Sequence, residues 1–394
     1  MIWNSNTIYA LGLYRMVGQL IGIWPLKYNS IWSKLRVTIF VASQIWLCFD
    51  IIEQFLVKGN CGTMAEVVDM MSWIAVGFST SVKMISLTIY QENMEKILTT
   101  AVVDWSKTID EKSRSIMLRY ATIGRIGAIM QMVSAYSVTF LQITRCFPAI
   151  IVTLNHHTNS SVPSCVPLWP ICWAPKTKLD FTFNFINQVF ISVIIVICYA
   201  GCEGFFFGTA MHLTGQFEEL HRNPKYLEAA ENSVQQTRQL VKFIKRHKHL
   251  LTLANNFEEA YNIIILVHVG VDIVIPCVSG ILLLISIKTA DYVTVGAMIV
   301  RIFLAYLQLF VYSYVGEQLS SQASKLQTAI YNSPWYNMST DVVKDMLFVI
   351  MKCNYPFNLT AGKIYDMNIS NFTGIVKTIS SYFSVIRLML MDDN

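Results

Sequence analysis

The sequence predicts an all-α membrane protein, and three observations support this fold class. Hydrophobic residues make up 54% of the 394 residues and charged residues only 14%, against about 25% charged residues in ordinary globular domains. Seven stretches are long and apolar enough to span a bilayer, which needs about 20 residues. Aromatic residues make up 12%, as expected where Trp and Tyr lie at membrane–water interfaces. The net charge of +5 comes without a dense basic patch, so no nucleic-acid partner is expected.

The N-terminal segment, residues 1–36, is predicted to lie on the cytoplasmic side of the membrane. It lacks the basic start and the small-residue cleavage site of a signal peptide. Its apolar run is interrupted by Arg15 and stopped by Pro25. We therefore expect a short helix at the membrane surface, with Trp24 and Trp32 at headgroup level.

Six predicted spans fall in residues 37–316, and the seventh falls in the C-terminal segment, residues 369–394. The seventh is the least hydrophobic, because Thr, Ser and Lys residues alternate with apolar ones. The spans are expected near residues 37–57, 65–90, 124–151, 181–213, 260–287, 293–316 and 369–391.

The distribution of Lys and Arg predicts the orientation. With the N-terminus in the cytoplasm, twenty of these residues lie in cytoplasmic segments and four in outer segments. Cytoplasmic loops carry an excess of Lys and Arg, so the N-terminus is predicted inside and, after seven spans, the C-terminus outside. The glycosylation sequon at Asn159 then lies in the second outer loop. Four further sequons, at Asn337, Asn358, Asn368 and Asn371, would be cytoplasmic or intramembrane and are interpreted as chance matches.

A charge inside a span costs about 2.5–3.5 kcal/mol at the helix centre. Lys83, Arg301, Lys377 and Arg387 lie inside predicted spans and therefore need a protein-facing or wet environment. One interpretation is that they reach the interface or form ion pairs with Asp50, Glu53 or Asp272. The other is that the spans enclose water, as in a channel.

No catalytic motif is found, so neither an enzyme nor a cofactor site is expected. The pairs His156–His157 and His247–His249 lack a Cys or carboxylate cluster that would complete a metal site, and we interpret them as solvated loop residues. Four cysteines are expected on or near the outer side, where one disulfide is compatible with their positions but its connectivity stays open. They are Cys61, Cys146, Cys165 and Cys172. In the fourth span, Gly204 and Gly208 would allow close helix packing.

One face of the seventh span carries small and apolar residues at spacings of three and four. The face contains Thr378, Ser381, Tyr382, Val385 and Met389. It would suit ordinary core packing or the wall of a narrow pore, with Val385 and Met389 as a constriction that excludes water. Arg387 is about 200° from Val385 and points away from this face.

The chain resembles the insect odorant receptors along nearly its whole length. The segments that carry the resemblance are Leu20–Pro25, Tyr314–Leu319, Ala329–Tyr336, Tyr355–Lys363, Asn371–Lys377 and Ser381–Arg387. The related gustatory receptors end in Thr-Tyr, five apolar residues and Gln-Phe. Here Ser381-Tyr382 is followed by Leu388-Met389, which speaks against that branch.

The resemblance implies a subunit of a ligand-gated, non-selective cation channel in the plasma membrane of olfactory sensory neurons. Four subunits would surround a pore lined by the seventh helix, and residues 317–368 would belong to a cytoplasmic helical anchor. The fourth-to-fifth connection, about 45 residues, lacks the insertion of the shared co-receptor. The chain therefore resembles the odorant-tuning subunit, which binds a small volatile odorant or pheromone, contacts membrane lipid and forms a heterotetramer with the co-receptor.

The same resemblance suggests where ligand and gate would lie. Val385, Leu388 and Met389 take the gate positions. The odorant pocket of the family lies in the outer half of the membrane, where aromatic residues with a few polar groups suit a small volatile. By depth and chemistry the pocket candidates are Met70, Trp73, Gly77, Val133, Tyr136, Ser137, Phe140, Phe185, Gln188, Val189, Ser192, Ile302, Phe303 and Tyr306.

Two other classes of protein stay open at this point. A metabotropic seven-span receptor would need the opposite orientation. A transporter would be expected to show repeat symmetry or paired broken helices, which the sequence does not show.

Overall fold

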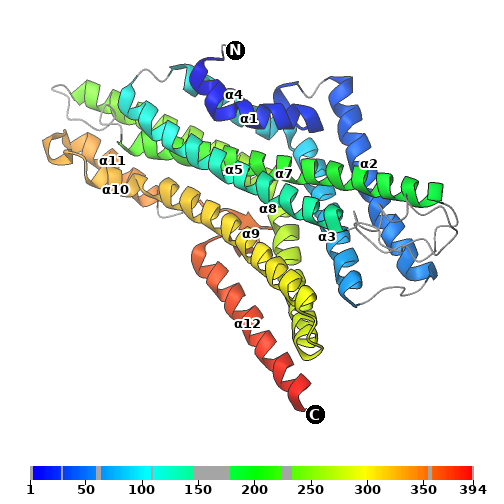
Figure 1. Cartoon of the computed structure of the whole chain (residues 1–394). Coiled ribbons are helices and arrows are strands. Elements are labelled where there is room, and N and C mark those ends of the chain that lie inside the picture. Colours follow the sequence, from blue (N-terminus) through cyan, green and yellow to red (C-terminus); the bar gives the residue numbers. More distant parts are fainter. Residues whose placement is uncertain are drawn as a thin grey trace.

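The structure, a computed structural model, describes residues 3–27, 30–58, 64–107, 110–145, 178–222, 233–353 and 357–392. Long helices form most of it, and the two ends of the chain lie at opposite ends of the molecule (Figure 1). The elements are α1 (Ser5–Ile21), η1 (Pro25–Lys27), α2 (Ile31–Lys58), α3 (Met64–Ile89), α4 (Gln91–Lys107), α5 (Glu111–Arg145), α7 (Lys178–Arg222), α8 (Ser233–Lys288), α9 (Tyr292–Ser324), α10 (Leu326–Tyr331), η3 (Trp335–Asn337), α11 (Thr340–Lys352), β1 (Thr360–Ala361), β2 (Tyr365–Asp366) and α12 (Ile369–Asp392).

The predicted all-α class is confirmed, with one small addition. Strands β1 and β2 pair antiparallel and form a short hairpin directly before α12. Each predicted span corresponds to a long helix, namely α2, α3, α5, α7, α8, α9 and α12. Among the described residues, five of these helices are long and apolar enough to cross a membrane, namely α2, α3, α7, α8 and α9.

The connection between the fourth and fifth spans is more helical than a loop. Helix α7 continues to Arg222 and α8 already begins at Ser233, well beyond the predicted ends at residues 213 and 260. Polar residues form these extensions, and Glu218 joins them to the N-terminal part of α5. Its carboxylate accepts hydrogen bonds from Arg119 and from the Tyr120 hydroxyl, both at 2.6 Å. Burial, together with this hydrogen bond, raises the pKa of Tyr120 to about 12, so its hydroxyl keeps the proton it donates at neutral pH.

The N-terminal helix corrects one expectation. The side chain of Asn4 caps α1 by accepting from the Thr7 amide, and Gly22 ends the helix in the left-handed conformation that glycine adopts readily. The turn that follows places Trp24 in the core, 2% exposed, with its ring 6.0 Å from that of Phe205. Trp24 is therefore enclosed by protein and is not an exposed residue of the membrane surface, because burial against α7 removes its ring from both water and lipid. Trp32 is 71% exposed.

Helices α5 and α7 lie against each other along much of their length, with α1 against both (Figure 1). The Tyr14 ring of α1 covers Gly208, and the Phe207 ring of α7 covers Gly127 of α5. A methyl group at either glycine would overlap the ring that covers it. The predicted close packing is confirmed at Gly208, where a methyl group would overlap the Tyr14 ring, whereas one at Gly204 would lie 3.4 Å from Ala128 of α5, an ordinary contact.

The C-terminal third begins where α9 ends. Helix α9 continues through residue 316 to Ser324, and α10 and α11 follow. Helix α11 buries Val342 and Met346 and exposes Leu347, Phe348 and Met351. From the hairpin, α12 runs away from the bundle and reaches the same end of the molecule as the start of α9 (Figure 1).

Candidate functional site

Two of the predicted pocket residues on α3 lie in a packed apolar cluster. Met70 is 3% exposed and Trp73 is 8% exposed. The other buried members of the cluster come from α2 and α7, namely Leu47, Ile51, Ile191 and Ile195. The structure thus brings the α3 candidates next to α7, where Gln188 and Ser192 are also buried.

The remaining candidates are less enclosed. Gly77 is buried against α2, at Leu47 and Cys48. The half-buried candidates are Phe185, Val189, Ile302 and Tyr306, and the exposed ones are Val133, Tyr136, Ser137, Phe140 and Phe303. The candidates of α5 therefore lie on the exposed surface of the single chain and not against Trp73. Asn159, His156, His157 and the cysteines 61, 146, 165 and 172 lie outside the described residues.

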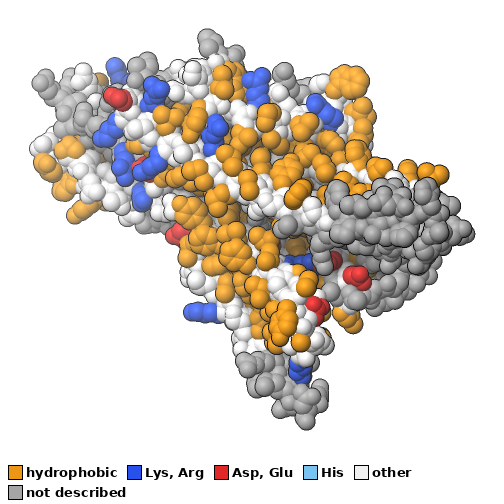
Figure 2. All heavy atoms as spheres, viewed as in Figure 1, with side chains coloured by type: hydrophobic (Ala, Val, Ile, Leu, Met, Phe, Trp, Pro, Cys, Tyr) orange, Lys and Arg blue, Asp and Glu red, His pale blue; other side chains and the backbone are white. Residues whose placement is uncertain are grey.

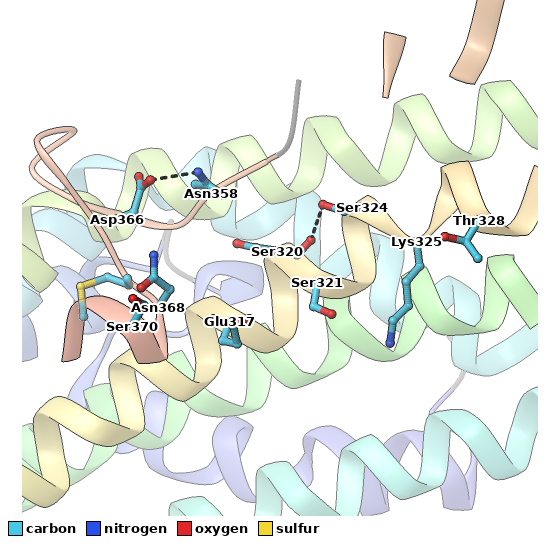
Figure 3. A pocket seen from close by; sticks show the side chains of 11 residues that line it. Glu317, Ser320, Ser321, Ser324, Lys325, Thr328, Asn358, Asp366, Asn368 and Ser370 are labelled. Carbon is cyan, nitrogen blue, oxygen red and sulfur yellow. Dashed lines mark hydrogen bonds between the residues drawn. The ribbon is translucent and has the colours of Figure 1, made fainter. Parts of the chain in front are cut away.

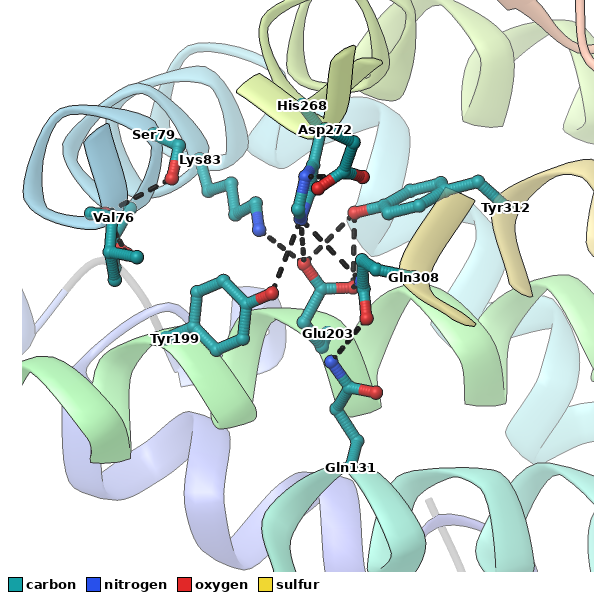
Figure 4. A network of polar contacts seen from close by, with 11 residues as sticks. Val76, Ser79, Lys83, Gln131, Tyr199, Glu203, His268, Asp272, Gln308 and Tyr312 are labelled. Atoms are coloured by element: carbon teal, nitrogen blue, oxygen red, sulfur yellow. Dashed lines mark hydrogen bonds and ion pairs between the residues drawn. The ribbon is translucent and has the colours of Figure 1, made fainter. Parts of the chain in front are cut away.

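A buried ionic cluster lies deeper along the same helices (Figure 4). Lys83 of α3 forms an ion pair with Glu203 of α7, with exposed fractions of 2% and 4%. The ammonium group of Lys83 also lies 4.3 Å from the ring centre of Tyr199, a cation–π contact. Because an isolated buried charge is very unfavourable, each of these two groups depends on the other.

Helices α8 and α9 complete the cluster. The His268 ring of α8 lies between two carboxylates, with Nε2 3.1 Å from Glu203 and Nδ1 3.3 Å from Asp272. From α9, the Tyr312 hydroxyl donates to Glu203 at 2.9 Å and the Gln308 amide donates to it at 3.0 Å. Glu203 therefore accepts hydrogen bonds from three other helices, as Figure 4 shows.

The cluster continues to α5 and lies next to the predicted pocket. Gln131 donates to Gln308 at 2.6 Å, which adds a fifth helix. Gln131 and Val133 are two residues apart in α5, and Gln308 and Tyr306 are two residues apart in α9, so the members of each pair lie at similar height but on different sides of their helix. Tyr199 follows Ser192 by seven residues, which is about two helical turns and keeps both on one face of α7. We define the ionic cluster as Lys83, Glu203, His268 and Asp272.

A second ion pair joins α3 to α9. Arg301 contacts Asp69, and both side chains are partly exposed. Lys83 and Arg301 thus form ion pairs within the protein, as the first of the two interpretations predicted. The partners differ from the predicted Asp50, Glu53 and Asp272. Lys83 pairs with Glu203 and Arg301 with Asp69, and Asp272 contacts His268. Lys377 is exposed on α12.

Helix α12 has one packed face and one exposed face. Ile379 is 3% exposed and Phe383 packs against Gly280 of α8. The predicted stripe lies on the other side, where Thr378 and Ser381 are exposed, Tyr382 is 49% exposed and Val385 is 53% exposed. The side chains of Arg387, Leu388 and Met389 lie outside the described part. Core packing within one chain therefore does not explain the stripe at its described positions.

A polar pocket of about 560 Å³ lies where α9 meets the hairpin (Figure 3). Glu317 accepts at 3.4 Å from the amide of Ile369, the first residue of α12. Asn358 donates to Asp366, another residue that lines the pocket, at 3.0 Å. The other residues that line the pocket are Ser320, Ser321, Ser324, Lys325, Thr328, Met367, Asn368 and Ser370.

Glu203, the centre of the ionic cluster, is not among the residues predicted from the sequence. Two signals could have revealed it. Glu203 is an acidic residue in the apolar run from 181 to 213, and His268 and Asp272 are one turn apart in another span. A buried charge needs a partner, so Lys83 and Glu203 could have been matched by sign.

The fold and this site define a helical protein with several helices of membrane-spanning length and a polar cluster inside its bundle. A comparison with protein families matches residues 63–380 to the 7tm odorant receptor family. The chain belongs to this odorant receptor family, a family of receptors and not of enzymes.

Individual relatives are distant in sequence. Odorant receptor 47a of Drosophila melanogaster is 24% identical over 222 residues, which is 55% of this chain and 56% of the relative. The odorant receptor coreceptor of Aedes aegypti is 23% identical over 146 residues, 36% of this chain and 30% of the relative. The first of these alignments spans about half the length of the relative.

The likeness in fold covers nearly the whole chain. The olfactory receptor OR5 of the insect Machilis hrabei, solved in complex with eugenol, has a TM-score of 0.73 and covers 97% of this chain and 99% of its own, at 12% identity. A structure of the same receptor described without eugenol has a TM-score of 0.75. At this identity the likeness shows the fold alone.

Proposed function

We propose that this chain is the odorant-tuning subunit of a ligand-gated, non-selective cation channel. The observation that carries the proposal is the divided surface of α12. One face packs on α8 and α9, whereas Val385 and its stripe stay exposed in the single chain. Several copies of such a face around an axis would form a pore with an apolar constriction that excludes water when narrow. Membership of the odorant receptor family supports this reading.

The proposed ligand is a small volatile odorant or pheromone, bound among α3, α5, α7 and α9 in the outer half of the membrane. The packed cluster around Trp73 and the nearby polar residues Gln188 and Ser192 support this placement. The receptor of Machilis hrabei with the same fold was solved with eugenol, a small aromatic compound. The proposed site thus offers apolar contact with few polar groups, as such ligands need.

The proposed partner is the odorant receptor co-receptor, in a heterotetramer within the plasma membrane of olfactory sensory neurons. Residues 37–316 would hold the pocket, residues 317–368 the cytoplasmic anchor and residues 369–394 the pore helix. The exposed apolar residues Leu347, Phe348 and Met351 of α11 support an anchor that contacts other subunits. Seven spans with the N-terminus inside are part of this proposal.

Current recording tests the proposal in cells that express this chain with and without the co-receptor, while G-protein signalling is blocked. A channel subunit should give odorant-evoked cation current that needs the co-receptor and persists under the block. Current that disappears under the block would favour a metabotropic receptor. A response that needs neither the co-receptor nor G proteins would contradict the proposed tuning role.

A further inference from the structure

Helix α8 connects the ionic cluster to the middle of α12. His268 and Asp272 hold α8 in the cluster, and Gly280 lies two turns further along the same helix. Pro276 lies between them and has no amide hydrogen, so it cannot donate to the carbonyl of Asp272. The helix therefore lacks one of its backbone hydrogen bonds where it leaves the cluster. This is the point where the segment from 277 onward bends most easily.

The contact between α8 and α12 depends on a glycine. The ring of Phe383 lies directly on Gly280, and a methyl group at position 280 would overlap it. Phe383 comes one turn after Ile379, which is also buried. Val385 is two residues from Phe383 and so about 200° around the helix. Pressure on Phe383 from α8 would therefore move Val385 toward the side on which the stripe is exposed.

The beginning of α12 is held separately, by α9. Glu317 accepts from the Ile369 amide, and the Phe310 and Phe372 rings lie 5.6 Å apart in an edge-on arrangement. Among the described contacts, α12 is thus fixed by α9 at its start and by α8 at Phe383. The position of its second half then follows the segment of α8 beyond Pro276.

We propose that the Gly280–Phe383 contact transmits the state of the odorant pocket to the pore helix, with the ionic cluster as the fixed point of α8. The ionic cluster joins α3, α7 and α8, and Tyr312 and Gln308 of α9 are hydrogen-bonded to it. Of these four helices, α3, α7 and α9 also carry predicted pocket residues. Ligand binding among these helices changes the direction in which α8 leaves the cluster, and Phe383 carries this change to α12. The inference rests on the proposed channel function.

The substitution Gly280→Ala tests the contact in the complex with the co-receptor. The added methyl group pushes Phe383 away from α8 and moves Val385 toward the exposed side, which narrows the proposed pore. We expect lower current without odorant and a half-maximal odorant concentration about fivefold higher or more, by the same factor for every odorant. The rank order of odorants should not change, because the contact does not touch the pocket.

Two matched controls and a double substitution sharpen the test. Gly270 of α8 and Gly296 of α9 are helical glycines with open space where a methyl group would lie, so Gly270→Ala and Gly296→Ala should leave the response unchanged. In a Phe383→Ala background there is no ring to displace. Gly280→Ala should then have no further effect. If Gly280→Ala alone fails to reach the cell surface, the double variant can still be compared with Phe383→Ala.

Three outcomes overturn the inference. One is an unchanged response of Gly280→Ala at normal surface expression, and another is a changed rank order, which would make Gly280 a pocket residue. The third is an equal effect of Gly280→Ala with and without the Phe383 ring. The channel proposal fails differently, because the unmodified subunit pair would then give no odorant current.

Discussion

At the residue scale, the ionic cluster is defined by the dependence of Lys83 and Glu203 on each other. Both side chains are almost fully buried, and Tyr312, Gln308 and His268 take the remaining hydrogen-bonding positions of the carboxylate. Removing one member of such a pair leaves the other charge without compensation. Removing both leaves neutral groups of similar volume, which often changes stability little.

We therefore expect Lys83→Met to lower the free energy of unfolding by about 3–5 kcal/mol. The double variant Lys83→Met/Glu203→Gln should recover most of this loss. Thermal unfolding of the purified receptor, followed by size-exclusion chromatography, measures the stability of the single and the double variant. Lys344 is 73% exposed, so Lys344→Met is the matched control and should not change stability. A double variant less stable than Lys83→Met would show that the charges do not compensate each other.

Trp73 is the aromatic residue that best combines predicted pocket depth with burial in the structure. Trp73→Ala should change the rank order of odorants at normal surface expression, because it removes about 150–250 Å² of aromatic surface. Dose–response recordings with a panel of odorants measure this. Trp46, on α2, is 67% exposed, and Trp46→Ala should leave the rank order intact. Equal loss for all odorants would place Trp73 in gating and not in the pocket.

At the element scale, α12 shows how one helix divides its residues between two environments. Its packed face carries Ile379 and Phe383, and its exposed face carries Tyr382 and Val385. The packed face fixes the helix to its own chain. The exposed face is left for other subunits and for the proposed pore.

We expect Val385→Thr to increase current in the absence of odorant or to alter ion permeability. The hydroxyl group gives water a hydrogen-bonding partner in the closed constriction, so the constriction fills more easily. The rank order of odorants should not change. Recordings in the complex with the co-receptor measure all three properties.

Arg387→Gln is the companion substitution, because Arg387 is about 200° from Val385 along the helix. It should leave permeability nearly unchanged. If Arg387→Gln alters permeability and Val385→Thr does not, then the face of α12 is assigned wrongly and the gate lies elsewhere.

At the scale of the whole molecule, Lys and Arg side chains are unevenly distributed over the face that Figure 2 shows. In Figure 2, Lys and Arg side chains gather on the half that holds α4 and the beginning of α5, and hydrophobic side chains cover much of the half around α9. The apolar residues of α9 include Ile299, Val300 and Phe303, each more than half exposed. This uneven distribution agrees with the excess of Lys and Arg that predicts a cytoplasmic N-terminus.

The orientation predicts which end of the chain an antibody can reach. With epitope tags at both ends, intact cells should be labelled only through the C-terminal tag, and permeabilised cells through both. Fluorescence microscopy and flow cytometry measure this. N-terminal labelling of intact cells would reverse the orientation and favour a metabotropic receptor.

The pattern of apolar stretches predicted the helices well, because a span needs a long apolar run that can be read locally. The positions of α3 and α12 agree closely with their predicted spans. The extensions of α7 and α8 were missed, because residues 214–222 and 233–259 are rich in polar residues and resemble a loop by hydropathy. Trp24 was misplaced for a related reason, since an amphipathic ring suits either an interface or a core.

The candidate site was less predictable. The sequence identified Lys83 and Arg301 as charges that need a partner, but not their partners. Glu203 is 120 residues from Lys83 in the chain, and no local pattern joins two residues so far apart. Val133 and Tyr136 were chosen by depth in the membrane, and depth does not determine which side of a helix faces the interior.

The sequence by itself determined the membrane character, the helical class, the order of the apolar helices and the resemblance that family membership confirms. These follow from hydropathy, charge counts and local motifs, which act over one or two helical turns. Only the tertiary structure decided that Lys83 pairs with Glu203, that Trp24 is buried against α7 and that Gly280 receives the Phe383 ring. The physical reason is that burial and ion pairing depend on which helix faces meet, and helix packing brings together residues more than a hundred positions apart.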